Sequence, residues 1–202
     1  MDDDTWPEDR AAFLEAASIA RRDLLAVATF QYRRLSDGAL SPPPGIVRSS
    51  VCSFLGGGSL FHLPSVLSVG GYRECFVYGY EEPELAMRLW LAGRRVEYLP
   101  GIVVAHNQFH SAEENRDYRE YDYLYARNGI LMSSMNMPWW FGLPHGLLRS
   151  VRRSAYQRRN YWVKLSGTLS GIYLSFTMRK ERNPCSPRKA LEWFRFSRNY
   201  SA

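Results

Sequence analysis

Two acidic clusters and a histidine are the residues in this sequence whose types and spacing could support chemistry. One residue separates Asp2 from Asp4, and both come just before an expected helix start. Carboxylates at this spacing can converge on a hard divalent cation such as Mg2+ or Mn2+, which prefers oxygen ligands and is often shared with substrate phosphates. A solvated acidic terminus or a helix cap has the same composition, so the aspartates alone leave both interpretations open.

The second cluster consists of Glu81, Glu82 and Glu84 at the start of a predicted helix. Glu84 lies four residues before Arg88, which is the spacing of an ion pair on one helix face. Glu81 and Glu82 stand where a loop enters the helix, a position that faces a cleft in many α/β folds. A carboxylate there could take a proton from an acceptor hydroxyl, and stabilisation of the helix start by its dipole is the alternative.

A histidine at the end of an apolar segment completes the set of candidate residues. His106 follows the apolar run 102–105, and His110 comes four positions later. Imidazole nitrogens are common metal ligands, but histidines at strand ends are also common as hydrogen-bonded structural residues. The residues alone therefore leave open whether His106 is a ligand and whether His110 takes its place.

Strands and helices are predicted to alternate over the first half of the chain. Thr5, Pro7 and Glu8 have the pattern of a helix start, with a hydroxyl cap, a proline in the first turn and a glutamate three residues after the cap. The other predicted elements are strands at 24–32 and 59–62, a helix from Pro83 that stops at Gly93, and strands at 96–99 and 102–105. This alternation predicts an α/β layer architecture.

Charge is distributed unevenly along the chain. The formal net charge is +6, with 26 Lys and Arg residues against 20 Asp and Glu residues. Acidic residues crowd the first positions and arginines the C-terminal quarter, which is where we expect an anionic partner to bind. Interleaved basic and aromatic residues would also suit nucleic acid, but no recognisable nucleic-acid motif accompanies them, so we expect no such partner.

Residues 111–202 are predicted to form a helical, basic appendage on an α/β domain that spans residues 1–110. The segment 147–177 would suit a helix lying on an anionic membrane surface, although an ordinary amphipathic helix packed on the domain has the same pattern. Its most apolar part contains Lys164 and several serines and falls short of the roughly 20 apolar residues that a spanning helix needs. Peripheral contact with the cytoplasmic membrane face is the resulting expectation.

The cysteines and the start of the chain indicate a compartment. Cys52, Cys75 and Cys185 are an odd number at wide spacing, with neither a zinc-knuckle pattern nor the density of a disulfide scaffold. Met1 leads directly into aspartates and not into a charged and then apolar signal segment. We therefore expect a reducing, cytoplasmic location.

In their order and spacing, these motifs resemble the second half of family 2 glycosyltransferases of the GT-A type. The run from Asp2 to Glu8 is similar to the aspartate-x-aspartate strand end of that family, which a proline-started helix follows. The stretch from Gly56 to His106 is similar to the remainder, through Gly70-Gly71-Tyr72, Glu74, Phe76, Gly79, Glu81-Glu82-Pro83-Glu84-Leu85, Arg88, Ala92-Gly93 and Pro100. The resemblance implies a partial GT-A fold, with a mixed sheet, flanking helices and a C-terminal helical appendage.

The resemblance also implies a role for each candidate residue. Asp2 would contact the donor ribose or the metal, Asp4 would ligate the metal, and His106 would help to hold the metal or the diphosphate. Glu82 occupies the position at which the family usually has an aspartate as catalytic base. Arg127, which follows the histidine, would meet the diphosphate. The implied cofactor is Mg2+ or Mn2+.

The implied activity is the inverting, metal-dependent transfer of a sugar from a nucleotide-sugar donor to a hydroxyl of a saccharide or lipid-linked acceptor. The family's nucleotide-binding half, roughly the first hundred residues of its domain, has no counterpart before Asp2. We therefore expect a truncated transferase or one that a partner completes. A catalytically inactive remnant that binds acceptor or membrane is the alternative.

Overall fold

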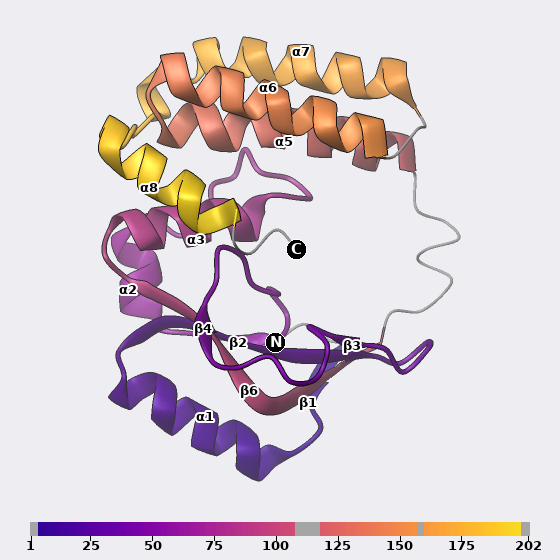
Figure 1. The fold of residues 1–202 in the computed structure, drawn as a ribbon, viewed down its shortest axis with the longest axis vertical. Coiled ribbons are helices and arrows are strands. Elements are labelled where there is room, and N and C mark those ends of the chain that lie inside the picture. The colour runs from indigo at the N-terminus through magenta and orange to yellow at the C-terminus, as the bar shows by residue number, and fades with distance from the viewer. Residues whose placement is uncertain (1–3, 108–117, 157–159, 199–202) are drawn as a thin grey trace. The chain divides into compact units, whose positions relative to one another are not determined.

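The computed structural model describes residues 4–107, 118–156 and 160–198, and the chain divides into two compact units (Figure 1). The first unit consists of residues 1–71 and 85–116, and the second of residues 72–84 and 117–202. The boundary falls inside helix α3 (Glu81–Leu91), so the segment before this helix belongs with the C-terminal helices. Two of the predicted site residues, Asp2 and His110, lie outside the described residues.

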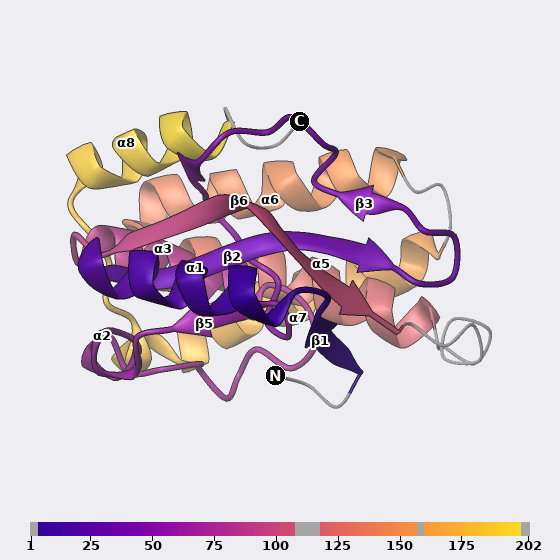
Figure 2. The same cartoon turned by 90° about the horizontal axis from the view of Figure 1, so that it is seen from below.

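A mixed open sheet forms the centre of the first unit. Its strands in the described residues are β1 (Thr5–Pro7), β2 (Leu25–Arg34), β3 (Leu40–Ser41), β4 (Ser49–Ser50), β5 (Ser59–Phe61) and β6 (Arg95–His106). The two long strands, β2 and β6, lie side by side and parallel, as Figure 2 shows. β1 and β4 pair antiparallel with β6, and β3 and β5 pair antiparallel with β2. The mixed sheet with its flanking helices is the α/β class that the sequence predicts.

Helices cover both faces of this sheet because the long strands are apolar on both sides. On one face, Ala16 of α1 (Arg10–Arg22) packs with Phe30 and Val104 in one buried cluster. On the other face, Val66 of α2 (Leu63–Ser68) packs with Val27 in a second cluster, to which the C-terminal part of α3 also contributes. Near-continuous apolar runs are typical of strands buried in this way.

The first helix starts later than the sequence predicts. Thr5 and Pro7 belong to strand β1, where Thr5 stands opposite His106, and α1 begins at Arg10. Asp9 is the N-cap, and its Oδ1 atom accepts hydrogen bonds from the backbone N–H groups of Ala11 at 2.7 Å and Ala12 at 3.1 Å. The predicted Thr5 cap is therefore wrong, because pairing with β6 holds that segment extended.

The two predicted strands before His106 are one strand. β6 runs unbroken from Arg95 to His106, through Pro100 and Gly101. Gly101 has φ +84, which a glycine adopts without steric cost, and the register between β2 and β6 shifts opposite this position, between Thr29 and Gln31. The Pro-Gly pair thus produces an irregularity inside the strand and does not end it.

Four α-helices form most of the second unit in the described residues: α5 (Tyr118–Asn136), α6 (Trp139–Tyr156), α7 (Tyr161–Thr177) and α8 (Pro187–Arg198), with a short 3-10 helix, η1 (Arg179–Glu181), before α8. α5 lies against both α6 and α7 and is buried along most of its length. None of the described helices is long and apolar enough to cross a membrane.

Glycines allow the close approach of these helices. A Cβ atom added to Gly142 of α6 would lie 2.5 Å from the Ser133 carbonyl oxygen of α5, and one added to Gly171 of α7 would lie 2.6 Å from the Arg127 carbonyl oxygen. Gly167 faces the carbonyl of Tyr123 even more closely. Both outer helices therefore contact the backbone of α5 directly, in the manner of small-residue helix interfaces.

Candidate functional site

The first unit brings one pair of predicted site residues together. Asp4 directly precedes β1 and His106 ends β6, and the pairing of Thr5 with His106 aligns the two strands. The Oδ2 atom of Asp4 lies 3.3 Å from the Nε2 atom of His106. The His106 side chain is 14% exposed and that of Asp4 is 38% exposed, so the pair is reachable from solvent through the carboxylate.

Backbone hydrogen bonds fix the pair from both sides. The N–H of Asn107 donates to the carbonyl of Asp4 at 2.8 Å, and the N–H of Leu35 donates to the carbonyl of His106 at 3.2 Å. The ring of Tyr32 meets the His106 imidazole edge-on, with 6.2 Å between the ring centroids. The Nδ1 atom of His106 is buried and has no hydrogen-bond partner within the part of the chain that the structure describes.

The Asp4 carboxylate oxygen is a ligand that a hard divalent cation prefers, whereas the His106 imidazole nitrogen is more typical of transition-metal sites. Mg2+ binds its ligands at about 2.1 Å in octahedral geometry, so two adjacent ligands on such an ion lie about 3 Å apart. The 3.3 Å between Asp4 Oδ2 and His106 Nε2 is close to that spacing, and it is also the distance of a direct contact between carboxylate and imidazole. Among the described residues no group of three or more His, Cys, Asp or Glu side chains could hold a metal. Mg2+ commonly keeps several waters and binds through one or two protein ligands together with substrate phosphates.

The carboxylates at the start of α3 belong to the second unit and have different surroundings from one another. Glu84 is buried, and its Oε1 atom accepts hydrogen bonds from Arg73 Nη1 at 2.8 Å and from Asn136 Nδ2 at 3.1 Å. Sequence reasoning missed Arg73 and Asn136 as its partners, because neither stands at helical spacing from Glu84. Glu84 therefore has a structural role, tying the start of α3 to α5.

The neighbouring glutamates remain candidates for chemistry. Glu82, the predicted catalytic base, is partly buried in the first turn of α3. Glu81 has a buried Oε2 atom without a hydrogen-bond partner in the described part of the structure. Buried polar atoms are nearly always hydrogen-bonded in native proteins, so this orphaned carboxylate oxygen is an unusual feature of the first turn of α3.

Strained backbone leads into these glutamates. Tyr78 and Tyr80 have φ values of +55 and +73, in the left-handed region that residues other than glycine seldom adopt, and Gly79 between them has φ +95. Buried Asn128 of α5 holds this turn, because its Nδ2 atom donates to the carbonyl of Gly79 at 2.6 Å and to that of Val77 at 3.2 Å. Strain of this kind persists only when surrounding contacts impose it, and it is concentrated at functional sites.

Arg127, the predicted diphosphate contact, supports the same loop. Its Nη2 atom donates to the carbonyl of Cys75 at 2.9 Å, and its Nε atom donates to the Asn128 side chain at 2.9 Å. Arg127 and Glu82 lie in the second unit, whereas Asp4 and His106 lie in the first. In the structure, Arg127 therefore binds the 72–80 loop.

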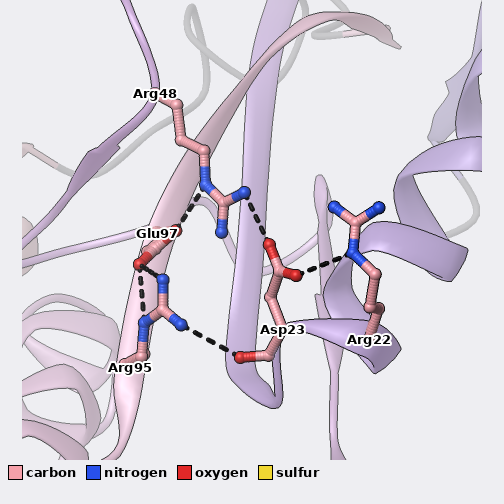
Figure 3. A network of polar contacts seen from close by, with 5 residues as sticks. All are labelled: Arg22, Asp23, Arg48, Arg95 and Glu97. Atoms are coloured by element: carbon pink, nitrogen blue, oxygen red, sulfur yellow. Dashed lines mark hydrogen bonds and ion pairs between the residues drawn. The ribbon is translucent and has the colours of Figure 1, made fainter.

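An ion-pair network in the first unit was not predicted from the sequence (Figure 3). Arg48 bridges two carboxylates, through Nη1 to Asp23 Oδ2 at 2.6 Å and through Nε to Glu97 Oε2 at 2.7 Å. Arg95 also binds Glu97, and Arg22 binds Asp23 at 2.9 Å. Hydrogen bonds from Arg22 and then Arg48 lower the pKa of Asp23 to about 2. The network connects the end of α1 with β6 and the segment before β4, so its role is structural.

The first unit also has an open cavity of about 580 Å³. Its lining comes from α1, β5, α2 and the turn before β6, and consists of Ala17, Ala20, Arg21, Leu24, Leu25, Leu60, Phe61, His62, Ser65 and Arg94. Neither Asp4 nor His106 is among these residues, so the cavity is separate from the candidate site.

Comparison with known proteins does not assign the chain to a family. No protein-family model matches the chain, and no curated protein sequence matches it. The candidate site therefore rests on the residues and geometry given above.

Proposed function

We propose that this chain carries part of the active site of a metal-dependent, inverting glycosyltransferase with a partial GT-A fold. The observation that carries the proposal is the pair formed by Asp4 and His106 at adjacent strand ends, with 3.3 Å between carboxylate oxygen and imidazole nitrogen. The mixed open sheet with flanking helices is compatible with that fold. The order of the motifs in the sequence, with an acidic pair, a glutamate-led helix and a closing histidine, supports the same function.

Asp4 and His106 would hold Mg2+ or Mn2+, with Asp2 as a further ligand or a contact to the donor ribose. The cation would neutralise negative charge on the departing nucleoside diphosphate. The described donors are one carboxylate and one imidazole, so water and diphosphate oxygens would complete the coordination sphere. Arg127 is the proposed further contact for the diphosphate.

Glu82 would act as the catalytic base. Its carboxylate would take the proton of an acceptor hydroxyl while that oxygen bonds to the anomeric carbon of the donor sugar. The bond between the anomeric carbon and the diphosphate oxygen breaks, its electron pair leaves with the diphosphate, and the anomeric configuration inverts. The acceptor would be a saccharide or a lipid-linked sugar.

Metal and nucleotide binding test the proposal directly. The purified chain is titrated with Mn2+ in the absence and presence of a nucleoside diphosphate, and bound Mn2+ is followed by electron paramagnetic resonance. We expect the diphosphate to tighten Mn2+ binding, and we expect coupling of the Mn2+ spin to an imidazole nitrogen that disappears in His106→Ala. The matched control is Glu15→Gln, because Glu15 is an exposed acidic residue on α1.

Two outcomes would reject the proposal. Absence of diphosphate-dependent Mn2+ binding would favour a catalytically inactive chain. Equal loss of binding in His106→Ala and Glu15→Gln would show that the effect is not specific to the pair. Transfer activity then separates the two glutamates: Glu82→Gln should lower the rate by about 10²- to 10⁴-fold with Mn2+ binding unchanged, whereas a selective loss in Glu81→Gln would assign the base to Glu81.

A further inference from the structure

Helix α7 buries small and polar residues and exposes large apolar residues. Its buried positions are Lys164, Gly167, Gly171 and Ser175. Its exposed large apolar residues are Tyr161, Trp162, Leu165, Leu169, Tyr173 and Phe176. Trp162 is 83% exposed and Leu169 is 58% exposed. A surface helix of a globular protein ordinarily has the opposite arrangement, with its apolar stripe facing the core.

Specific contacts fix this rotation of α7. Gly167 and Gly171 lie against the backbone carbonyls of Tyr123 and Arg127 on α5, where no larger side chain would fit. The Ser175 hydroxyl lies 2.6 Å from the Ser134 hydroxyl of α5 and donates to the carbonyl of Gly171. The inner face of α7 therefore packs against α5 within the second unit. Turning the helix to bury its apolar stripe would place large side chains against the α5 backbone.

Helix α6 adds apolar residues to the exposed surface. Trp140, Leu148 and Val151 are exposed on α6, while Gly142 and Gly146 of the same helix lie against α5. The two helices are joined by a hydrogen bond of 2.7 Å between the hydroxyls of Ser150 and Thr168. We refer to the exposed residues Trp140, Leu148, Val151, Trp162, Leu165, Leu169, Tyr173 and Phe176 as the α6–α7 apolar surface.

The charge of this region indicates what covers the surface. The sequence contains no Asp or Glu from Tyr123 to Lys180, a stretch that includes both helices. The basic residues in the same stretch are Arg127, Arg149, Arg152, Arg153, Arg158, Arg159, Lys164, Arg179 and Lys180. Lys164 is buried and Arg127 binds the 72–80 loop, so these two do not contribute to an outer charged surface. The composition of the stretch otherwise complements an anionic surface, and each basic residue near an anionic membrane adds to binding.

We propose that the α6–α7 apolar surface docks on an anionic lipid bilayer, with both helices lying in the plane of the interface. The apolar side chains would enter the boundary between headgroups and acyl chains, and the tryptophan and tyrosine rings would lie at headgroup depth. Neither helix can cross the bilayer, so the contact is peripheral. This inference rests on α6 and α7 and not on the metal pair, so each can fail without the other.

Vesicle binding by the full chain tests the proposal. Co-sedimentation is measured with phosphatidylcholine vesicles and with vesicles in which about one third of the lipid is phosphatidylglycerol. We expect strong binding to the anionic vesicles only. Raising the salt from about 0.1 M to 1 M shortens the Debye length from about 10 Å to 3 Å and should weaken that binding. Brominated lipids should quench tryptophan fluorescence, less so in Trp162→Phe.

Matched variants locate the contact. Leu169→Ser lies on the α6–α7 apolar surface, and Leu14→Ser on α1 is the control because Leu14 is 56% exposed. Burying one leucine in the interface strengthens partitioning by roughly tenfold, so we expect Leu169→Ser to weaken vesicle binding by about that factor and Leu14→Ser to leave it unchanged. Circular dichroism and the thermal transition should be the same for both variants, since neither side chain is buried.

Three results would overturn the proposal. The first is absence of binding to either vesicle. The second is equal binding by Leu169→Ser and Leu14→Ser. The third is a stable dimer in light scattering that Leu169→Ser converts to a monomer without any vesicle association, which would assign the surface to a second copy of the chain.

Discussion

The Oδ2 atom of Asp4 lies 3.3 Å from the Nε2 atom of His106, because an antiparallel pairing of β1 with β6 joins the two ends of the first unit's sequence. The pairing aligns Thr5 with His106, and the residue before the strand is then next to the residue that ends its neighbour. Under the proposed function, a carboxylate and an imidazole held in this way would bind a cation as one unit.

The Asp4 and His106 substitutions should not be additive. Asp4→Asn and His106→Ala should each lower Mn2+ affinity by at least about tenfold, since each removes one of few protein donors. The double variant should lose little more than either single variant, because groups that bind as a unit show coupling in a double-mutant cycle. Isothermal titration of the four proteins measures this. Full additivity would indicate that the two side chains bind independently.

Stability at acidic pH should depend on Asp23. Its pKa is lowered from 3.8 to about 2 in the folded chain, so the carboxylate contributes stability above pH 4 that is lost as the pH falls toward 2. In Asp23→Asn this component disappears, and the unfolding free energy should vary less with pH across that window. Urea unfolding at a series of pH values measures it. Glu15→Gln, at an exposed position of α1, is the control and should follow the unsubstituted chain.

Asn128 should be important for stability. Its amide group is buried and satisfies the carbonyls of Gly79 and Val77 in the strained turn. Asn128→Ala leaves these acceptors without their donor and should cost about 2–3 kcal/mol. Asn128→Asp keeps the side-chain shape but replaces the amide donor with an acceptor, so it should be at least as destabilising. If Asn128→Asp were neutral by urea unfolding, the hydrogen bonds to the turn would not be its main contribution.

The glycines of the helical unit should differ in how they tolerate alanine. At Gly171 an added Cβ would lie 2.6 Å from the Arg127 carbonyl oxygen, and backbone cannot move aside cheaply, so Gly171→Ala should destabilise by about 2–4 kcal/mol. At Gly129 the nearest atom would be a side-chain atom of Tyr80 at 3.3 Å. Gly129→Ala should therefore be close to neutral, since alanine favours the helix by about 1 kcal/mol. Thermal unfolding of the two variants compares them.

Much of the first unit could be read from the sequence. The apolar run at 24–32 predicts the position of β2, and the segment at 59–62 predicts β5. Gly93 predicts the end of α3, where its φ of +71 stops the helix. Periodicity and turn residues succeed here because they act locally. They fail at Thr5, where pairing with a distant strand overrides a local helix-start pattern.

The candidate site was only partly visible in the sequence. Asp4 and His106 could be named as candidates, but their approach depends on the register of β1 against β6. The partners of Glu84 and of Asn128 could not be named, because they join segments far apart in the chain without any repeating spacing. Long-range hydrogen bonds of this type are set by packing and leave no periodic signal.

The sequence by itself determined the α/β class, the residue types available for chemistry, and a basic stretch without acidic residues from Tyr123 to Lys180. Only the tertiary structure decided which face of α7 is buried. Its composition allows burial of the apolar stripe, and helix periodicity alone favours it. The glycine contacts with α5 impose the opposite rotation, since close backbone packing excludes large side chains from that side. The apolar side chains are exposed for this reason.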